Sequence, residues 1–375
     1  MNVLMLVTDA YGGRGGIALY NRHLIESVCS WEKTNHVTTL PRSIIYAFET
    51  FPASLTYVDE AAGSVARYIF QCLKQAFVSV TPGLVICGHL HLLPFAYLLS
   101  LRFKCPLVCV IYGVDSWTPT PHAIVNYLCC KVSTFISIRR LTSSRLKEWA
   151  NIEDAVFHDL PCAVDTKVFK VLPKRQDLIE NFGLAGKKVI LTCGRLDIEN
   201  DFDDRKGFDE IIEILPKLRM KVPEIVYLII GDGDDKERLQ LKARDFGVEE
   251  IVVFAGYVSP SEQADFYRLG DVFAMPGSNP LFDRYPYRLV FLEALACGLP
   301  VVGSVMKNQL DAADPLAQKL IIQVEPNDQQ DIIRGILEGL SVGKKFNPAI
   351  NELSYESFIK KTHIILNQII LNRQK

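Results

Sequence analysis

Two positively charged segments flank one loop in the second half of the chain, and their spacing suits the binding of a phosphate. Gly194-Arg195 ends an apolar run typical of a strand, and Arg205-Lys206-Gly207 precedes a run with helical periodicity. Cations from the two ends of one loop can converge on one point. Fixed Arg and Lys donors stabilise the charge that develops on a diphosphate leaving group. An ordinary solvated charged loop is the alternative interpretation.

A glycine-rich loop near the N-terminus is a second candidate anion site. The segment YGGRGG (residues 11–16) connects an apolar, strand-like run to a run with helical periodicity, where backbone amides and the helix dipole can face an anion. Its spacing differs from the G-x-G-x-x-G fingerprint of dinucleotide-binding proteins. Gly15 and Gly16 directly precede the helical run and are the best placed to approach a phosphate, although a tight turn without a ligand explains them equally well.

The elements that position these residues alternate regularly along both halves of the chain. Apolar runs of strand length are separated by runs of helix length, which predicts parallel sheets covered on both faces. We therefore predict an α/β fold with two Rossmann-like, doubly wound domains that face a cleft. The first spans residues 1–165, with the C-terminal helix 353–375 packing back on it, and the second spans residues 166–352.

Composition excludes several classes of protein. The formal net charge of −2 over 375 residues and the absence of a zinc-finger or RNA-binding signature argue against a nucleic-acid partner. The ten scattered cysteines indicate buried reduced thiols, and we expect no metal site. A first strand in place of a signal peptide predicts a cytoplasmic protein. Residues 65–80 and 123–136 combine aromatic and basic side chains, which fits either buried helices or contact with the inner face of a membrane.

Five segments in a fixed order carry a resemblance to a known family. They are GRLD with DRKGFDEII, YLIIGDGDDKERL, VVFAGYV, DVFAMPG and LVFLEALACGLPVV. This order resembles the donor-binding domain of retaining glycosyltransferases of the GT-B fold, family four, over most of residues 160–305. The first half resembles the acceptor domain of that family more loosely, through its glycine loop and through PLVCVIYGVDSW.

The resemblance implies roles for particular residues. Arg195 and Lys206 match the pair that contacts the donor diphosphate, and Glu293 matches the glutamate that holds the ribose hydroxyls at the start of a helix. The resemblance also implies two sets of backbone contacts. The amides of Leu289 and Val290 would face the phosphates, and the backbone of Val253 and Phe254 would border the base.

The chain departs from the family pattern at two places. Tyr285 stands where the family has a glutamate that reaches the donor sugar, and nearby Asp283 is either its substitute or an ordinary surface aspartate. Tyr112 stands where the family often has a histidine. Asp115 and His89, which follow two different strands, are the candidates for a catalytic role in its place, with a structural histidine as the alternative.

The resemblance implies a retaining hexosyltransferase that needs neither metal nor cofactor. Its co-substrate would be a UDP- or GDP-linked sugar, and its acceptor a glycan or lipid-linked saccharide in polysaccharide or glycoconjugate assembly. Two alternatives stay open. Because two expected residues are replaced, the chain could be a nucleotide-sugar-binding protein with impaired catalysis. An epimerase or dehydrogenase is disfavoured by the absence of a dinucleotide fingerprint.

Overall fold

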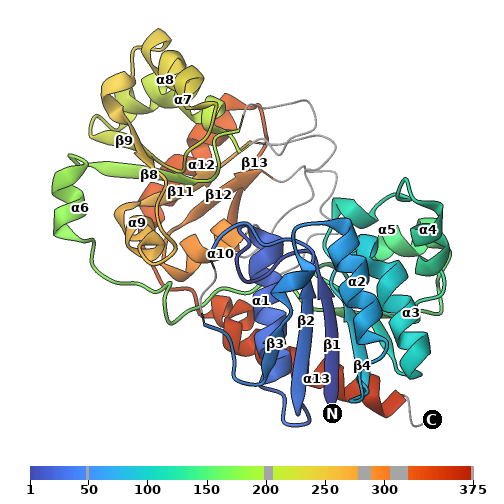
Figure 1. The fold of residues 1–375 in the computed structure, drawn as a ribbon. Coiled ribbons are helices and arrows are strands. Elements are labelled where there is room, and N and C mark those ends of the chain that lie inside the picture. Colours follow the sequence, from blue (N-terminus) through green and yellow to red (C-terminus); the bar gives the residue numbers. More distant parts are fainter. Residues whose placement is uncertain (48–49, 198–205, 278–288, 305–319, 373–375) are drawn as a thin grey trace. The chain divides into compact units, whose positions relative to one another are not determined.

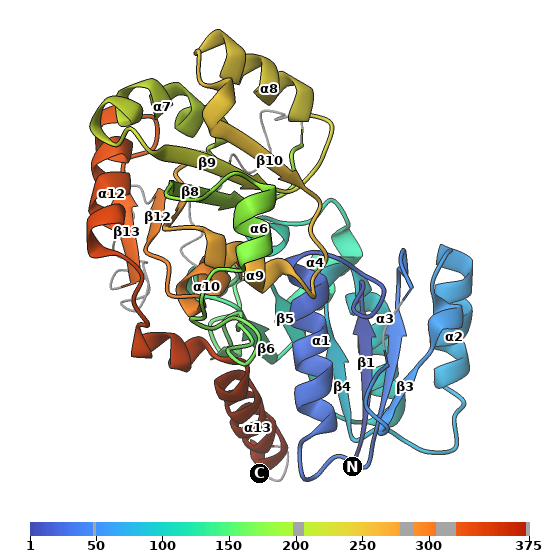
Figure 2. The same cartoon turned by 90° about the vertical axis from the view of Figure 1, so that its left-hand side faces the viewer.

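The computed structural model describes residues 1–47, 50–197, 206–277, 289–304 and 320–372 of the 375. The chain divides into two compact units (Figures 1 and 2). Unit 1 comprises Met1–Ala163 together with Tyr355–Lys375, and unit 2 comprises Val164–Ser354.

Unit 1 is built on a seven-stranded sheet with the order β3-β2-β1-β4-β5-β6-β7, in which every pair of neighbours is parallel. Its central strands are continuous apolar runs because helices cover both faces of the sheet. The strands are β1 (Asn2–Val7), β2 (His36–Pro41), β3 (Leu55–Tyr57), β4 (Leu84–Cys87), β5 (Leu107–Ile111), β6 (Thr134–Ser137) and β7 (Val156–Asp159).

Helices cover the unit 1 sheet in two groups. On one face, α1 (Gly16–Cys29) and α13 (Tyr355–Asn372) share a hydrophobic core with the strands, and the His363 ring lies 2.9 Å from the Ser27 carbonyl oxygen. The other face carries α2 (Val65–Gln75), α3 (Leu93–Phe103), α4 (Ala123–Cys129) and α5 (Arg140–Ala150). The helix at the C-terminus therefore belongs to unit 1.

Unit 2 has a six-stranded parallel sheet with the order β10-β9-β8-β11-β12-β13. The strands are β8 (Lys188–Cys193), β9 (Ile225–Ile230), β10 (Val252–Gly256), β11 (Val272–Met275), β12 (Val301–Ser304) and β13 (Ile321–Val324). The helices are α6 (Gln176–Asn181), α7 (Phe208–Lys221), α8 (Lys236–Asp245), α9 (Gln263–Leu269), α10 (Leu289–Ala296) and α12 (Gln329–Val342). Short 3₁₀ turns, such as η2 (Leu90–Leu92) and η3 (Val114–Ser116) in unit 1, connect some of the elements.

The strand order places the predicted loops where such sheets bind ligands. In unit 1, β1 lies between β2 and β4, and in unit 2, β8 lies between β9 and β11, so the strand order reverses at β1 and at β8. Open α/β sheets bind ligands beyond the carboxyl ends of their strands at this reversal. The predicted fold class, two parallel α/β sheets with interleaved helices, is confirmed. Across the described part of the chain, no helix has the length and apolar character required to cross a membrane.

Candidate functional site

The loop after β8 brings two of the predicted cationic residues together. A Cβ built on Gly194 would lie 2.7 Å from Cδ of Lys206, so the lysine stem crosses the backbone where glycine leaves room. Arg195 follows directly, with its side chain 79% exposed and its Nε donating to Oδ2 of Asp197 at 2.8 Å. The structure thus places Lys206 beside the Gly194-Arg195 segment, as the spacing predicted. Arg205 lies outside the described residues.

Backbone contacts between the ends of β8 and β9 fix the start of this loop, Gly194–Leu196. The Gly194 amide donates to the Ile230 carbonyl at 2.9 Å, and the Leu196 amide donates to the Asp232 carbonyl at 3.1 Å. Gly231 has φ +139°, and a Cβ there would lie 1.9 Å from the Gly194 carbonyl oxygen. Only glycine permits this approach. The segment bearing Arg195 therefore leaves the sheet in a direction set by its neighbouring strand.

Glu293 is a buried carboxylate with partners on α9. Tyr267 donates its hydroxyl hydrogen to Oε2 at 2.7 Å, and Gln263 Nε2 donates to the same oxygen at 3.3 Å. Burial raises the pKa of Glu293 to about 7, because desolvation penalises the charged form. Gln263 and Tyr267 were not singled out from the sequence, although their spacing of four residues places them on one face of a helix.

Leu289 and Val290 are the first described residues of α10, and Glu293 lies one turn further along the same helix. The hydrogen bonds to its carboxylate come from the neighbouring helix α9. Val253 and Phe254 lie in β10, the outermost strand and two strands away from β8, and both are half-buried.

Two further residues singled out from the sequence, Asp283 and Tyr285, lie outside the described residues. Their predicted relation to the donor sugar stays a prediction.

In unit 1, Tyr112 belongs to a buried hydrogen-bond chain. Its hydroxyl donates to Oδ1 of Asn21 at 2.7 Å, and Asn21 Nδ2 donates to the Asp9 carbonyl at 2.9 Å. Burial raises the pKa of Tyr112 well above its ordinary value, so the hydroxyl stays protonated. Tyr112 therefore links the end of β5 to α1 and to the loop after β1.

His89 and Asp115 meet at the carboxyl ends of β4 and β5. The His91 amide donates to Nδ1 of His89 at 3.2 Å, so the proton of the neutral ring is on Nε2, which lies 3.8 Å from Oδ2 of Asp115. Oδ1 of Asp115 accepts the Gly113 amide at 2.7 Å, while Oδ2 is buried and has no hydrogen-bond partner in the described part of the protein.

The ionisation of this pair follows from burial. Desolvation lowers the pKa of His89 to about 4, with a smaller contribution from the neighbouring charge of His91. Desolvation raises the pKa of Asp115 to about 6. At neutral pH the pair consists of a neutral N–H donor beside a carboxylate acceptor. Such an arrangement suits hydroxyl groups, which both donate and accept.

Gly15 and Gly16 lie at the start of α1 and face open space. Gly15 has φ +92° and provides no side-chain cap for the helix. A Cβ built on either glycine would meet no heavy atom within 4 Å. The first turn of α1 therefore has free space beside both glycines, and their approach to a phosphate stays a prediction.

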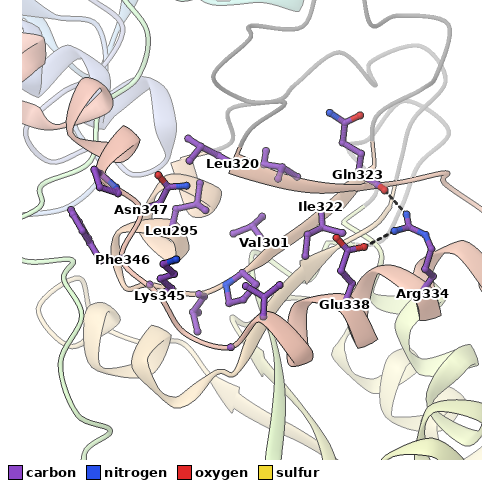
Figure 3. A pocket seen from close by; sticks show the side chains of 17 residues that line it. Leu295, Val301, Leu320, Ile322, Gln323, Arg334, Glu338, Lys345, Phe346 and Asn347 are labelled. Carbon is purple, nitrogen blue, oxygen red and sulfur yellow. Dashed lines mark hydrogen bonds and ion pairs between the residues drawn. The ribbon is translucent and has the colours of Figure 1, made fainter.

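A cavity of about 720 Å³ in unit 2 lies away from these residues. It lies at the amino ends of β12 and β13 (Figure 3), whereas Gly194 follows the carboxyl end of β8. Arg334 in its wall already pairs with Glu338 at 2.7 Å. None of the predicted donor contacts lines the cavity, so it is no candidate for the phosphate site. Within the described ranges, no cluster of His, Cys, Asp and Glu side chains is arranged to hold a metal ion.

Comparison with known proteins identifies the type of domain. Residues 174–352 match the family model of the glycosyl transferases group 1. The GDP-mannose-dependent alpha-(1-6)-phosphatidylinositol monomannoside mannosyltransferase of Mycolicibacterium smegmatis is 39% identical over 177 residues. That match covers 46% of this chain and 44% of the relative, so the chain spans less than half of the relative's length.

Two solved structures share the fold across nearly the whole chain. Anabaena HepE, solved in complex with UDP, matches with a TM-score of 0.70 and 15% identity, covering 98% of this chain and 100% of that one. Sucrose-phosphate synthase from Thermosynechococcus elongatus matches with a TM-score of 0.69 and 16% identity, covering 99% of each chain. Both likenesses concern the fold alone.

Proposed function

We propose that this chain moves a hexose from a nucleotide-diphosphate sugar to a glycan or lipid-linked saccharide, because residues 174–352 match the family model of the glycosyl transferases group 1. The observation that carries the proposal is the crossing of Gly194 by the Lys206 side chain beside Arg195. In this proposal Arg195 and Lys206 bind an anion beyond the carboxyl end of β8, where the strand order reverses. Open α/β sheets bind nucleotides at this position.

The donor is a UDP- or GDP-linked sugar. The Mycolicibacterium relative is GDP-mannose-dependent and acts on phosphatidylinositol monomannoside, which supports a guanine nucleotide and a lipid-linked acceptor. The Anabaena protein, which shares the fold, was solved with UDP, and a uracil nucleotide is the alternative that we propose. In the proposed complex, Glu293 accepts hydrogen bonds from the ribose, and the amides of Leu289 and Val290 face the phosphates.

The reaction retains the configuration at the anomeric carbon. The bond from that carbon to the β-phosphate oxygen breaks, and the acceptor oxygen forms its bond on the same face. The proton of the acceptor hydroxyl passes to the departing phosphate, whose charge Arg195 and Lys206 stabilise. Because these cations balance the diphosphate, the proposed reaction requires neither a metal ion nor another cofactor.

Unit 1 supplies the acceptor side in this proposal. Nε2–H of His89 and Oδ2 of Asp115 offer a donor and an acceptor to sugar hydroxyls, and Gly15 and Gly16 leave room at the helix terminus. We place the reaction in the cytoplasm, at the inner face of a membrane when the acceptor carries a lipid.

One observation favours a second candidate function. Tyr112 occupies the position at which the family often has a histidine, and its hydroxyl is committed to Asn21 inside the core. A tyrosine held in this way is not available to a sugar. If His89 does not take over its role, the chain binds a nucleotide sugar without transferring it, and tight nucleotide binding without turnover would identify that case.

The proposal is tested by thermal unfolding with UDP, GDP, ADP and their common sugar conjugates. A ligand at about one hundred times its dissociation constant stabilises the folded state by about 2.7 kcal/mol. We expect one base to raise the melting temperature of the wild type by several degrees and Lys206→Ala to lose most of that increase. Lys187→Ala, at an exposed lysine before β8, is the matched control.

Two results would contradict the donor site. One is the absence of a shift with every nucleotide, and the other is an equal shift in the wild type and Lys206→Ala. Once the base is known, release of the free nucleotide diphosphate in the presence of saccharide acceptors separates a transferase from a binding protein.

A further inference from the structure

Helix α2 has an exposed apolar face in addition to its buried one. Tyr68, Gln71 and Cys72 point into the core of unit 1. Five large apolar side chains on the helix and the turn after it are exposed, with Phe70 64% and Phe77 83% accessible: Val65, Ile69, Phe70, Leu73 and Phe77. Residues four apart lie on one side of a helix, so these side chains form one continuous stripe.

The neighbouring helices extend this stripe into a surface. Helices α2, α3 and α4 lie in a row on one face of the unit 1 sheet (Figure 1), with α3 in contact with both others. Leu98 and Leu101 of α3 and Ile124 and Tyr127 of α4 are also exposed. We call these nine apolar residues of α2, α3 and α4 the apolar face. Large exposed apolar patches on a folded protein mark interaction sites.

Basic residues outnumber acidic ones around the apolar face. Between Asp59 and Glu148 the sequence has nine Lys and Arg residues and four acidic residues, although the whole chain carries a net charge of −2. Two of the acidic residues, Asp59 and Glu60, are exposed on η1 (Asp59–Ala61), which contacts α2. Arg67, Lys74, Arg102 and Lys131 are exposed on or directly after α2, α3 and α4. In the part of the chain that the structure describes, these four cations form no ion pair.

We propose that the apolar face docks on an anionic lipid surface. Exposed aromatic and aliphatic side chains bordered by Lys and Arg are the composition of segments that lie in a membrane interface. The apolar side chains would enter the boundary between headgroups and acyl chains, and the cations would meet the phosphates of the lipids. An acidic protein partner would match the cations but would leave these exposed aromatic and aliphatic side chains without an apolar partner.

This inference rests on the proposed function in one respect, since a lipid-linked acceptor gives the docking its purpose. The docking itself depends only on the described residues of unit 1, so it can be tested without a sugar donor. A negative nucleotide screen would remove the proposed function and leave the lipid-binding surface standing, whereas failure to bind vesicles would remove the surface and leave the donor site untouched.

The experiment is co-sedimentation of the full chain with vesicles. One set contains equal parts of phosphatidylcholine and phosphatidylglycerol, and the other contains phosphatidylcholine only. We expect retention on the anionic vesicles, weakened at high salt because salt screens exposed charges. The double variant Phe70→Ser/Phe77→Ser should bind at least about tenfold more weakly, since it removes two large apolar side chains from the interface.

The matched control carries the same kind of change on unit 2. Met220→Ser/Leu241→Ser alters two exposed apolar side chains, of which Met220 is 79% accessible, and should bind vesicles like the wild type. A second variant, Arg67→Glu/Lys74→Glu, should weaken binding to anionic vesicles by about fivefold or more for each cation replaced. Unchanged thermal unfolding of all the variants shows that the effect is not one of folding.

Three outcomes would overturn the proposal. The first is equal sedimentation with and without anionic vesicles. The second is unchanged vesicle binding by Phe70→Ser/Phe77→Ser. The third is a change in oligomeric state in that variant, measured by light scattering, without any vesicle binding by the wild type, which would assign the apolar face to contact between two copies of the chain.

Discussion

In unit 2, a Cβ placed on Gly231 would come within 1.9 Å of a backbone oxygen, whereas in unit 1 a Cβ on Gly15 or Gly16 would meet no heavy atom within 4 Å. Gly231 permits two segments of the protein to touch, and this contact holds Gly194 against the end of β9. The loop before α1 has no such neighbour, so its glycines leave space beside the helix terminus. Glycines in the loops after β9 and β1 thus serve different physical purposes.

The polar side chains beyond the carboxyl ends of the strands also differ between the two units. In unit 2 Arg195, which pairs with Asp197, and Lys206 place two cations near the end of β8, and we propose that they bind a diphosphate. In unit 1 His89 is neutral at physiological pH and faces the carboxylate of Asp115, an arrangement better suited to hydroxyl groups than to an anion. In the function we propose, unit 2 therefore binds the phosphates of the donor, and unit 1 binds the hydroxyl groups of the acceptor saccharide.

The largest effect is expected from Gly231→Ala. The new methyl group would collide with backbone, which cannot move aside as a flexible side chain can, and we expect the free energy of unfolding to fall by about 3 kcal/mol or more. Urea unfolding followed by circular dichroism measures it. Gly247→Ala is the control, because Gly247 also has positive φ, +64°, but has no heavy atom within 4 Å of the added group. If both variants lose the same free energy of unfolding, the positive φ explains the need for glycine at position 231, and the close backbone approach does not.

Gly16→Ala tests the open loop of unit 1 and should have a smaller effect of a different kind. Stability should change by no more than about 0.5 kcal/mol, since the methyl group meets open space. If a substrate lies against this helix terminus, the rate of sugar transfer should fall about tenfold, because small displacements of a bound substrate are costly. Steady-state kinetics with the identified donor would measure this. An unchanged rate would mean that the loop is only a turn.

The smallest effect concerns the pH dependence of nucleotide binding in unit 2. Glu293 has a pKa of about 7 in the folded protein, above its ordinary value of 4.5, so it ionises as the pH rises through neutrality. Ribose hydroxyls donate to the ionised form, and we expect affinity to rise about threefold between about pH 6 and pH 8. Titration calorimetry of the wild type and Glu293→Gln would show this rise and its absence. A rise of the same size in the variant would exclude Glu293 as its origin.

The same carboxylate predicts the direction of a stability change. A raised pKa means that the folded state holds the proton more tightly than the unfolded state. The contribution of Glu293 therefore becomes less favourable as the pH rises from about 4.5 through about 7, and it stays unfavourable above that range. Glu293→Gln should remove this part of the pH dependence.

Most strands of both sheets could be predicted from the sequence, but β2, β3, β7 and β13 were not singled out from it. A run such as Ile225–Ile230 is apolar at every position, which indicates a strand buried on both faces, and all six residues are buried. The alternation of these runs with helix-length segments indicates parallel order, because parallel neighbours need a crossover. The apolar periodicity of residues 65–75 likewise predicts a helix. These features depend on neighbours that are close along the chain.

Tertiary structure decided what the periodicity left open. The sequence of α2 contains apolar residues on more than one side, and only packing shows that Tyr68 and Cys72 point inward while Phe70 and Leu73 face outward. The hydrogen bond of Tyr112 to Asn21 joins residues 91 positions apart. Such pairs are chosen by the three-dimensional path of the backbone, which no local pattern records.

For the candidate site, the sequence likewise identified residues, and the folded structure showed their contacts. Spacing along the chain identified Arg195 and Lys206 as candidates, and the family resemblance added Glu293, since motif order is a property of the sequence. It did not show that the Lys206 stem crosses Gly194, that Tyr267 and Gln263 hold Glu293, or that His89 and Asp115 meet across two strand ends. Ionisation and hydrogen bonding depend on burial and on distances of a few ångströms, and folding sets these quantities by bringing together segments that are remote in the chain.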